Sequence, residues 1–377
     1  MTSRYPAIAP SILALFASRG AASVDVPVLQ PADPFLDMAG EDLRRRIFLT
    51  ESETGAALCL RPEFTIPVCL DHIASQAGTP RRYAYLGEVF RQRREGGNEF
   101  FQAGIEDLGD TDTARADARL VADAHALLTL TLPGIPLTVT LGDQTIFEAV
   151  LAALGLPRGW RMRLARAFGS ADMLAAALAD LANPPKNGAL PEPVAALVAD
   201  GDLERLAGHI ATDMAQAGLS PSAGRTPQEI ARRLVEKAEL RSVRLSAEAF
   251  AALEKFLAID VPLDGAAAAL EAFAKSAGLS LSSALANFSA RVEAISAQGL
   301  PPAAIRYDAA FGRPLDYYTG LVFEMSAGPG SESATRPLVG GGRYDRLLTL
   351  LGAKSPIPGV GFSVWLDRIE QLGGGAA

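Results

Sequence analysis

The spacing of apolar residues before residue 157 alternates between the periods of strands and helices. Two strand-like runs, 81–90 and 100–106, flank the polar, glycine-containing segment 91–99, which predicts a hairpin with a longer loop. Around this hairpin the pattern predicts helices over 10–19, 112–130 and 145–154, and strands over 24–29 and 137–141. This part of the chain therefore combines strands and helices.

From residue 157 to 299 the composition shifts to alanine and leucine. Apolar residues recur there three and four positions apart, which predicts a mostly helical segment with a loop at 183–188. After residue 301 the pattern predicts strands over 304–309, 317–325 and 359–364 and a short helix over 365–372. The Gly- and Ser-rich stretch 326–335 predicts a mobile hairpin tip. We expect one α+β domain, residues 1–156 and 300–377, interrupted by a helical insertion, residues 157–299.

Composition and charge narrow the functional classes. The 377 residues are 49% hydrophobic and 21% charged, with a net charge of −8, which argues against a dedicated nucleic-acid binder. Cys59 and Cys69 lack the spacing of metal ligands, and the three histidines are scattered, so neither a metal nor a cofactor is expected. The sequence has no signal-peptide pattern and no apolar run near ~18 residues. These features indicate a cytoplasmic protein.

Six segments carry the candidate chemistry. Residues 313–320 read Arg-Pro-Leu-Asp-Tyr-Tyr-Thr-Gly, and residues 340–345 read Gly-Gly-Gly-Arg-Tyr-Asp. The other four segments are 20–35, 60–65, 90–106 with its Phe-Arg-Gln-Arg start, and 359–368. Taken in their order along the chain, they resemble the motifs of class II aminoacyl-tRNA synthetases, specifically the histidyl branch. The resemblance implies an antiparallel sheet flanked by helices and a dimer interface at 20–35.

The resemblance also implies a histidine-binding pocket. Its eight residues are Glu63, Thr65, Arg91, Gln102, Glu106, Arg313, Tyr317 and Tyr318. A carboxylate such as Glu63 suits the ligand's ammonium, and a guanidinium suits its carboxylate in a bidentate pair. Glu106 and Tyr318 would each address one imidazole nitrogen, rejecting amino acids that lack the ring.

Each of these residues alone has a structural explanation. Glu63 could be a structural carboxylate, Tyr317 and Tyr318 core aromatics, and Arg91 a surface ion pair. The glycines at 340–342 could form a tight turn or bulge. Their joint order favours the pocket.

Departures from the synthetase pattern indicate a degenerate ATP site made of Arg93, Trp365 and Arg368. Arg93 stands where the family has a glutamate that accepts from adenine, and arginine accepts no hydrogen bond. Trp365 replaces a glycine at the floor of the ATP site, where an indole is expected to obstruct the nucleotide. Pro314 replaces another glycine and stiffens the backbone. Only nine residues follow Arg368, so no anticodon-binding domain is expected.

A histidine-binding protein of this kind resembles the regulatory subunits of ATP phosphoribosyltransferase. The resemblance implies a non-catalytic partner of the short-form catalytic subunit, in a hetero-octamer that starts histidine biosynthesis, with histidine as feedback effector. No catalytic residue is therefore expected. Two alternatives stay open: a ligase that makes histidyl-adenylate for an acceptor other than tRNA, and a module that binds uncharged tRNA.

Overall fold

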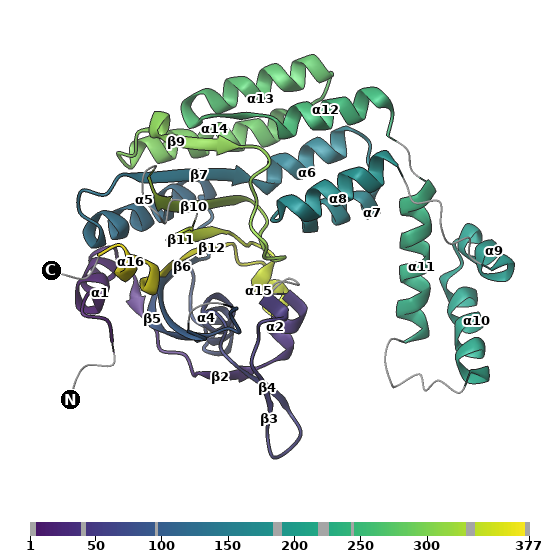
Figure 1. The fold of residues 1–377 in the computed structure, drawn as a ribbon, viewed down its shortest axis with the longest axis horizontal. Helices are drawn as coiled ribbons and strands as arrows, with labels where there is room; N and C mark the ends of the chain where they lie inside the picture. Colours follow the sequence, from purple (N-terminus) through teal and green to yellow (C-terminus); the bar gives the residue numbers. More distant parts are fainter. Residues whose placement is uncertain are drawn as a thin grey trace.

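The computed structural model describes residues 5–38, 43–94, 97–183, 191–217, 226–242, 245–328 and 336–373. A nine-stranded mixed sheet runs through it (Figure 1). In spatial order its strands are β1 (Ala22–Ser23), β5 (Arg81–Phe90), β6 (Glu99–Leu108), β12 (Gly359–Trp365), β11 (Val339–Arg343), β10 (Leu321–Ala327), β7 (Leu137–Asp143), β9 (Ile305–Asp308) and β8 (Asp260–Pro262). Neighbours are antiparallel except for the pairs β1–β5 and β7–β9. The α+β class is confirmed.

Successive side chains of the central strands point to opposite faces of the sheet, and each face carries its own hydrophobic core. Ala84 on β5 belongs to the larger core, and the next residue, Tyr85, belongs to the second. On β12, Val364 and Trp365 divide in the same way.

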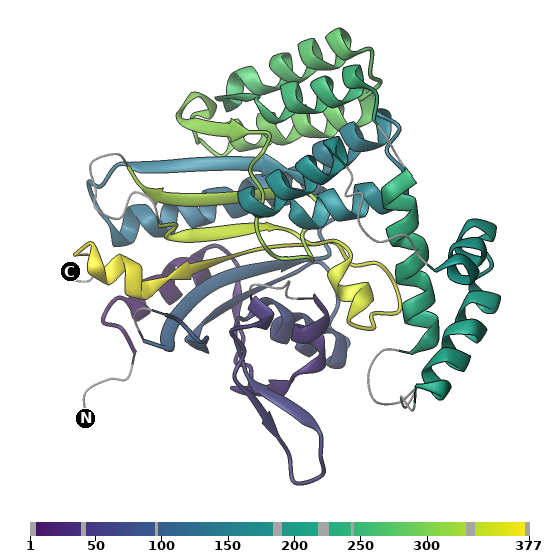
Figure 2. The same ribbon diagram turned by 45° about the vertical axis from the view of Figure 1, so that its right-hand side comes forward.

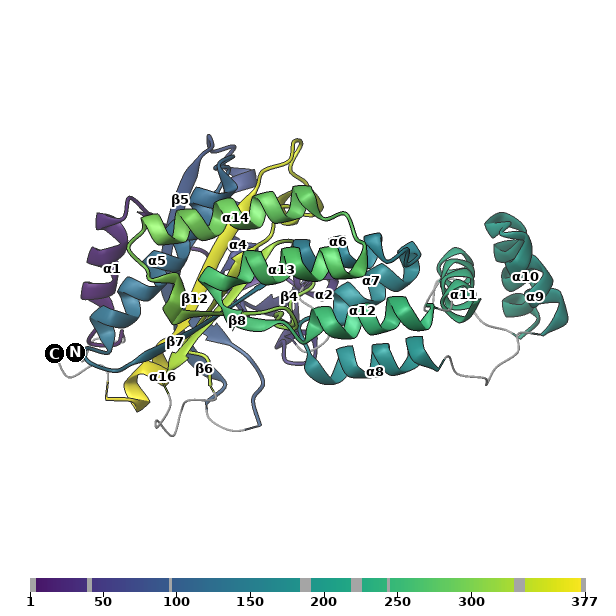
Figure 3. The same cartoon turned by 90° about the horizontal axis from the view of Figure 1, so that it is seen from above.

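Helices cover the face of the larger core. They are α1 (Ala9–Ser18), α5 (Thr113–Thr131), α6 (Gln144–Ala153), α7 (Arg158–Ala167), α8 (Ala171–Ala182), α12 (Ala247–Leu257), α13 (Leu263–Ala277), α14 (Ser282–Ala297) and α16 (Leu366–Gln371), with the 3-10 turn η1 (Pro302–Ala304). Helix α5 lies on the sheet and α14 packs against α5, as the view from above shows (Figure 3). Asp112 begins α5 because its side chain accepts a hydrogen bond from the Arg115 N–H.

The second core lies under α2 (Asp33–Met38), α4 (Thr65–Ala74) and α15 (Leu347–Leu350). A small sheet, β2 (Leu29–Pro31), β4 (Ala57–Leu60) and β3 (Leu49–Glu51), borders this core, and its β3–β4 hairpin projects from the body (Figure 2). The candidate functional residues lie on this side of the sheet.

A third small core joins α9 (Glu192–Asp200), α10 (Leu203–Gln216) and α11 (Pro227–Ser242), and α11 contacts α7. Other elements of the expected insertion at 157–299 are not separate from the rest of the chain. Strand β8 belongs to the nine-stranded sheet, and helices α12–α14 belong to the larger core, together with residues before 157 and after 299. The domain boundaries at 156 and 300 stay a prediction.

Several sequence predictions need correction. Residues 24–28 are not a strand; β1 ends before them at Ser23 and β2 begins after them at Leu29. Strand β10 begins at Leu321, since Tyr317 and Tyr318 lie in a turn before it. The glycines at 340–342 form the central strand β11, where a Cβ on Gly341 would lie 2.6 Å from the Gly361 carbonyl oxygen. The predicted hairpin tip at 326–335 and loop at 183–188 fall largely outside the described residues.

Within the described ranges, no helix combines the length and apolar character that crossing a membrane requires.

Candidate functional site

A cavity of about 180 Å³ opens on the side of the second core. It brings together seven of the eight residues predicted to bind histidine: Glu63, Thr65, Arg91, Gln102, Arg313, Tyr317 and Tyr318. The eighth, Glu106, does not line it. The volume is below the roughly 300–1,000 Å³ of common small-molecule pockets, so the cavity suits a ligand the size of an amino acid. We refer to it as the small cavity.

Glu63 lies two residues before the start of helix α4, at one wall of the small cavity. Its two carboxylate oxygens accept hydrogen bonds from the backbone N–H groups of Thr65 at 2.7 Å and Ile66 at 2.8 Å. Burial raises the pKa of Glu63, and these two hydrogen bonds oppose the shift. Burial also lowers the pKa of the nearby Arg91 to about 10, which leaves the guanidinium charged at neutral pH. The wall therefore combines a carboxylate that binds the N–H groups of the first turn of α4 with a partly buried cation.

Glu106 lies behind this wall, on β6. Its carboxyl accepts a hydrogen bond from the Thr65 hydroxyl at 2.7 Å and another from the Tyr344 hydroxyl. Burial raises its pKa to about 8, against these hydrogen bonds. The carboxyl thus fixes two hydroxyl-bearing residues that do line the small cavity.

Gln102 is the unsatisfied residue of the small cavity. Its side chain is 1% exposed, and neither its Nε2 nor its Oε1 has a hydrogen-bond partner. A buried amide without partners costs free energy. A ligand that offers both a donor and an acceptor would remove this cost, as an amino acid does with its ammonium and carboxylate.

Three tyrosines and Arg313 line the rest of the small cavity. The rings of Tyr317 and Tyr318 meet edge to face at 5.1 Å, and Tyr317 meets Tyr344 at 5.9 Å. Burial raises the pKa of all three, so their hydroxyls stay protonated and able to donate. The Arg313 guanidinium pairs with Glu324 and passes over Gly340, where a Cβ would lie 2.1 Å from Nη1.

Sequence reasoning missed Tyr344 as a member of this site. It lies in the 340–345 segment that carried the resemblance, but no role was assigned to it. Its ring lines the small cavity while its hydroxyl reaches back to Glu106. The signal was its position two residues after the glycine run at 340–342. Its ring has room to pack because Gly359 lies against it, where a Cβ would lie 2.3 Å from a carbon of the Tyr344 ring.

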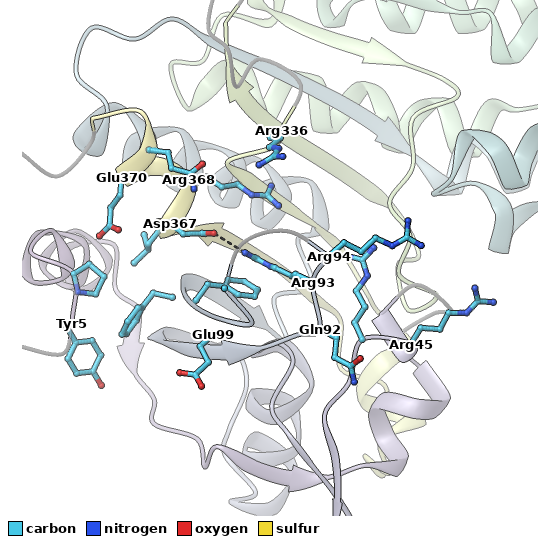
Figure 4. Close-up of a pocket in the computed structure, with 17 residues that line it drawn as sticks. Tyr5, Arg45, Gln92, Arg93, Arg94, Glu99, Arg336, Asp367, Arg368 and Glu370 are labelled. Atoms are coloured by element: carbon cyan, nitrogen blue, oxygen red, sulfur yellow. Dashed lines mark hydrogen bonds and ion pairs between the residues drawn. The ribbon is translucent and has the colours of Figure 1, made fainter.

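A second cavity has a volume of about 1120 Å³ (Figure 4). It adjoins the first, because Arg46 and Arg368 line both. We refer to it as the large cavity. Two residues of the predicted degenerate ATP site, Arg93 and Arg368, line it, whereas the third, Trp365, lines the small cavity. The Arg368 guanidinium lies 4.5 Å from the Trp365 ring centre, so the two form a wall between the cavities.

Among the residues that the structure describes, no cluster of histidine, cysteine, aspartate and glutamate could hold a metal ion. Cys59 and Cys69 are both buried and free, and burial raises the pKa of each thiol.

Comparisons with known proteins give the class first. The histidyl-tRNA synthetase family matches residues 2–213 and 214–369. A solved ATP phosphoribosyltransferase regulatory subunit/histidyl-tRNA synthetase from Bacillus halodurans shares the fold with a TM-score of 0.64 at 20% identity, over 97% of this chain and 78% of that one. Histidyl-tRNA synthetase from Nostoc sp. PCC 7120 gives a TM-score of 0.64 at 17% identity, over 98% and 73%. The expected class II synthetase-like fold is confirmed.

Sequence relatives then give the particular family. The ATP phosphoribosyltransferase regulatory subunit of Mesorhizobium japonicum is 78% identical over 99% of both chains, and that of Chelativorans sp. is 66% identical over 99% of both. This chain belongs to the family of ATP phosphoribosyltransferase regulatory subunits. The family expected from the sequence motifs is therefore confirmed.

Proposed function

We propose that this chain is the regulatory, non-catalytic subunit of an ATP phosphoribosyltransferase, required for the first step of histidine biosynthesis and for its feedback inhibition by histidine. The observation that carries the proposal is the 78% identity, over 99% of both chains, to a relative named as such a subunit. The unsatisfied Gln102 in a cavity of amino-acid size supports histidine as the effector.

Histidine would bind with its polar backbone groups toward Gln102. The ligand's ammonium would be held by Glu63, Thr65 and the Gln102 carbonyl oxygen, and its carboxylate by the guanidinium of Arg91 or Arg313. The imidazole would lie against the tyrosines, with Tyr318 addressing one ring nitrogen. Because Glu106 lies behind the lining, its contribution to ring recognition would come through the hydroxyls of Thr65 and Tyr344.

We also propose that this chain lacks aminoacylation activity. Arg93 supplies no acceptor for adenine, and its guanidinium lies 3.4 Å from the centre of the Phe100 ring. A purine that stacked on this ring would have to displace Arg93, which Asp367 holds by an ion pair of 3.0 Å. This arrangement disfavours nucleotide activation and leaves amino-acid binding unaffected.

Regulation requires a partner whose states histidine distinguishes. We place the short-form catalytic subunit in that role, in a cytoplasmic hetero-octamer whose regulatory chains pair through residues 20–35. Histidine then inhibits because it binds one state of the complex more tightly than the other.

The test is reconstitution with the short-form transferase. The purified chain should co-elute with the catalytic subunit, raise its turnover, and confer inhibition by histidine. A catalytic subunit that turns over equally well without this chain would contradict the proposal, as would histidine-dependent exchange of pyrophosphate into ATP by this chain alone.

A further inference from the structure

The large cavity carries a charge pattern that histidine binding does not use. Of its described lining residues, six are arginines: Arg45, Arg46, Arg93, Arg94, Arg336 and Arg368. Against these six guanidinium groups stand three carboxylates: Glu99, Asp367 and Glu370. The chain as a whole has a net charge of −8, so this local excess of positive charge opposes the overall balance. Such a basic concavity concentrates anions.

The charges are also separated within the cavity. In Figure 4, Glu99 and Glu370 lie toward the left, on the side of Tyr5, whereas Arg45 and Arg94 lie toward the right and Arg336 lies at the top centre. Asp367, the remaining carboxylate, pairs with Arg93. One end of the cavity is therefore lined mainly by guanidinium groups, which suit phosphate oxygens because their planar donors bind two oxygens at once.

Arg93 covers an aromatic ring on which the base of a nucleotide could otherwise stack. It covers one face of the Phe100 ring at 3.4 Å, and Arg91 lies 5.7 Å from the same ring centre. Phe100 also belongs to the second core and is 4% exposed, so little of its ring is open to a planar base. Tyr5 and Phe101 line the cavity too, and their rings pack against each other at 5.6 Å. A base bound beside the guanidinium groups therefore gains little stacking on Phe100.

Arg368 places the anion next to the amino-acid site. Burial lowers its pKa to about 10, so the guanidinium remains charged at neutral pH, and its Nη1 donates to the Pro337 carbonyl oxygen. Because Arg368 lines both cavities, an anion in the large cavity and an amino acid in the small one would share this wall.

We propose that the large cavity is a second ligand site, which binds an anion with at least two linked phosphates through its guanidinium groups and makes no use of a purine. The site is distinct from the histidine site and does not depend on the proposed function. Inorganic pyrophosphate has this chemistry, and so does the diphosphate group of a phosphorylated sugar.

The test is calorimetric titration of the whole chain with inorganic pyrophosphate, triphosphate, ATP and adenosine in magnesium-free buffer. Pyrophosphate should bind, adenosine should not, and ATP should bind no more tightly than triphosphate. Replacing two arginines together, Arg94→Gln with Arg336→Gln, should weaken pyrophosphate binding by about tenfold or more, since hydrogen bonds to charged groups are worth about 1.5–3 kcal/mol.

The matched control removes the same two charges elsewhere. Arg163 on α7 and Arg205 on α10 lie outside the large cavity, so Arg163→Gln with Arg205→Gln should leave pyrophosphate affinity unchanged. A separate variant, Arg93→Ala, should uncover Phe100 and make ATP bind about fivefold more tightly than triphosphate, the lower end of stacking on an aromatic ring.

Three results would overturn the site. They are no pyrophosphate binding by the wild-type chain, equal loss of affinity in the cavity and control variants, and adenosine binding on its own. A separate titration with histidine tests the proposed function. The two titrations are independent, so a negative result for one site does not affect the interpretation of the other.

Discussion

Thr65 donates a hydrogen bond of 2.7 Å from its hydroxyl to the Glu106 carboxyl, joining the first turn of α4 to the C-terminal part of β6. The same carboxyl accepts from Tyr344, which follows β11. One buried acid therefore sets the positions of two cavity-lining side chains from different parts of the sequence. In this position Glu106 organises the site from behind.

Stability should depend on pH through Glu106. Burial raises its folded-state pKa from 4.5 to about 8, so between these values the folded chain holds a proton that the unfolded chain has released. The free energy of unfolding therefore falls as pH rises through this window, by on the order of a few kcal/mol. Urea unfolding at about pH 5 and about pH 8 measures this loss.

The control for that measurement is Glu106→Gln, which keeps the shape and removes the titration. The loss of stability between about pH 5 and about pH 8 should be smaller in the variant than in the wild type. Equal losses in both proteins would show that Glu106 titrates normally.

Replacing Gln102 should separate stability from binding. Gln102→Leu removes two buried polar atoms without partners, so the free energy of unfolding should rise by about 1 kcal/mol or more. Histidine affinity should fall at least about tenfold, because the ligand loses both partners. Chemical unfolding and calorimetric titration give the two values. A destabilised variant with normal affinity would place Gln102 in the fold alone.

Gly361 should tolerate no side chain. It pairs with Glu106 across β12 and β6, and a Cβ there would lie 1.7 Å from Glu106 Oε2. Gly361→Ala should push the carboxyl off Thr65 and Tyr344, costing about 1–3 kcal/mol of stability and weakening histidine binding. Gly208 in α10 is the control, because an added Cβ there would meet no atom within 4 Å. Gly208→Ala should stabilise the chain by up to about 1 kcal/mol, and the reverse order of stabilities would contradict this account.

Local pattern was sufficient to predict the long elements. Strand β5 matches the predicted run 81–90 residue for residue, and α5 begins at Thr113, one residue into its predicted range and directly after the Asp112 cap. Short pairings were not predictable, because β1 and β2 depend on partners that are distant in the sequence: Leu29 pairs with Leu60, and Ala22 with Tyr83. The glycines of β11 carry no strand propensity, and only their close neighbours on β10 and β12 explain them.

The candidate site was likewise predictable from the sequence only in part. Residue types in the motifs identified Glu63, Gln102 and the tyrosines, and the fold places them around one cavity. Burial and partner choice could not be inferred, so the position of Glu106 behind the lining was missed. The basic end of the large cavity was missed as well, because Arg45 and Arg336 lie 291 positions apart in the sequence.

Arg291 should be the most costly polar residue to replace. Its buried guanidinium on α14 bonds Asp117 of α5 at 2.7 Å and also pairs with Asp143, whose other oxygen begins α6 by accepting from the Thr145 N–H at 2.8 Å. Arg291→Met keeps the apolar volume but leaves Asp143 without its cation, so unfolding should become easier by about 3–5 kcal/mol. The control Arg163→Met breaks a partly exposed pair with Asp180 and should cost less than about 1 kcal/mol. Chemical unfolding of both variants decides the matter: similar costs would mean that the ion network between α5, α6 and α14 contributes no more than a surface pair, and that the apolar contacts of α14 alone hold it on the sheet.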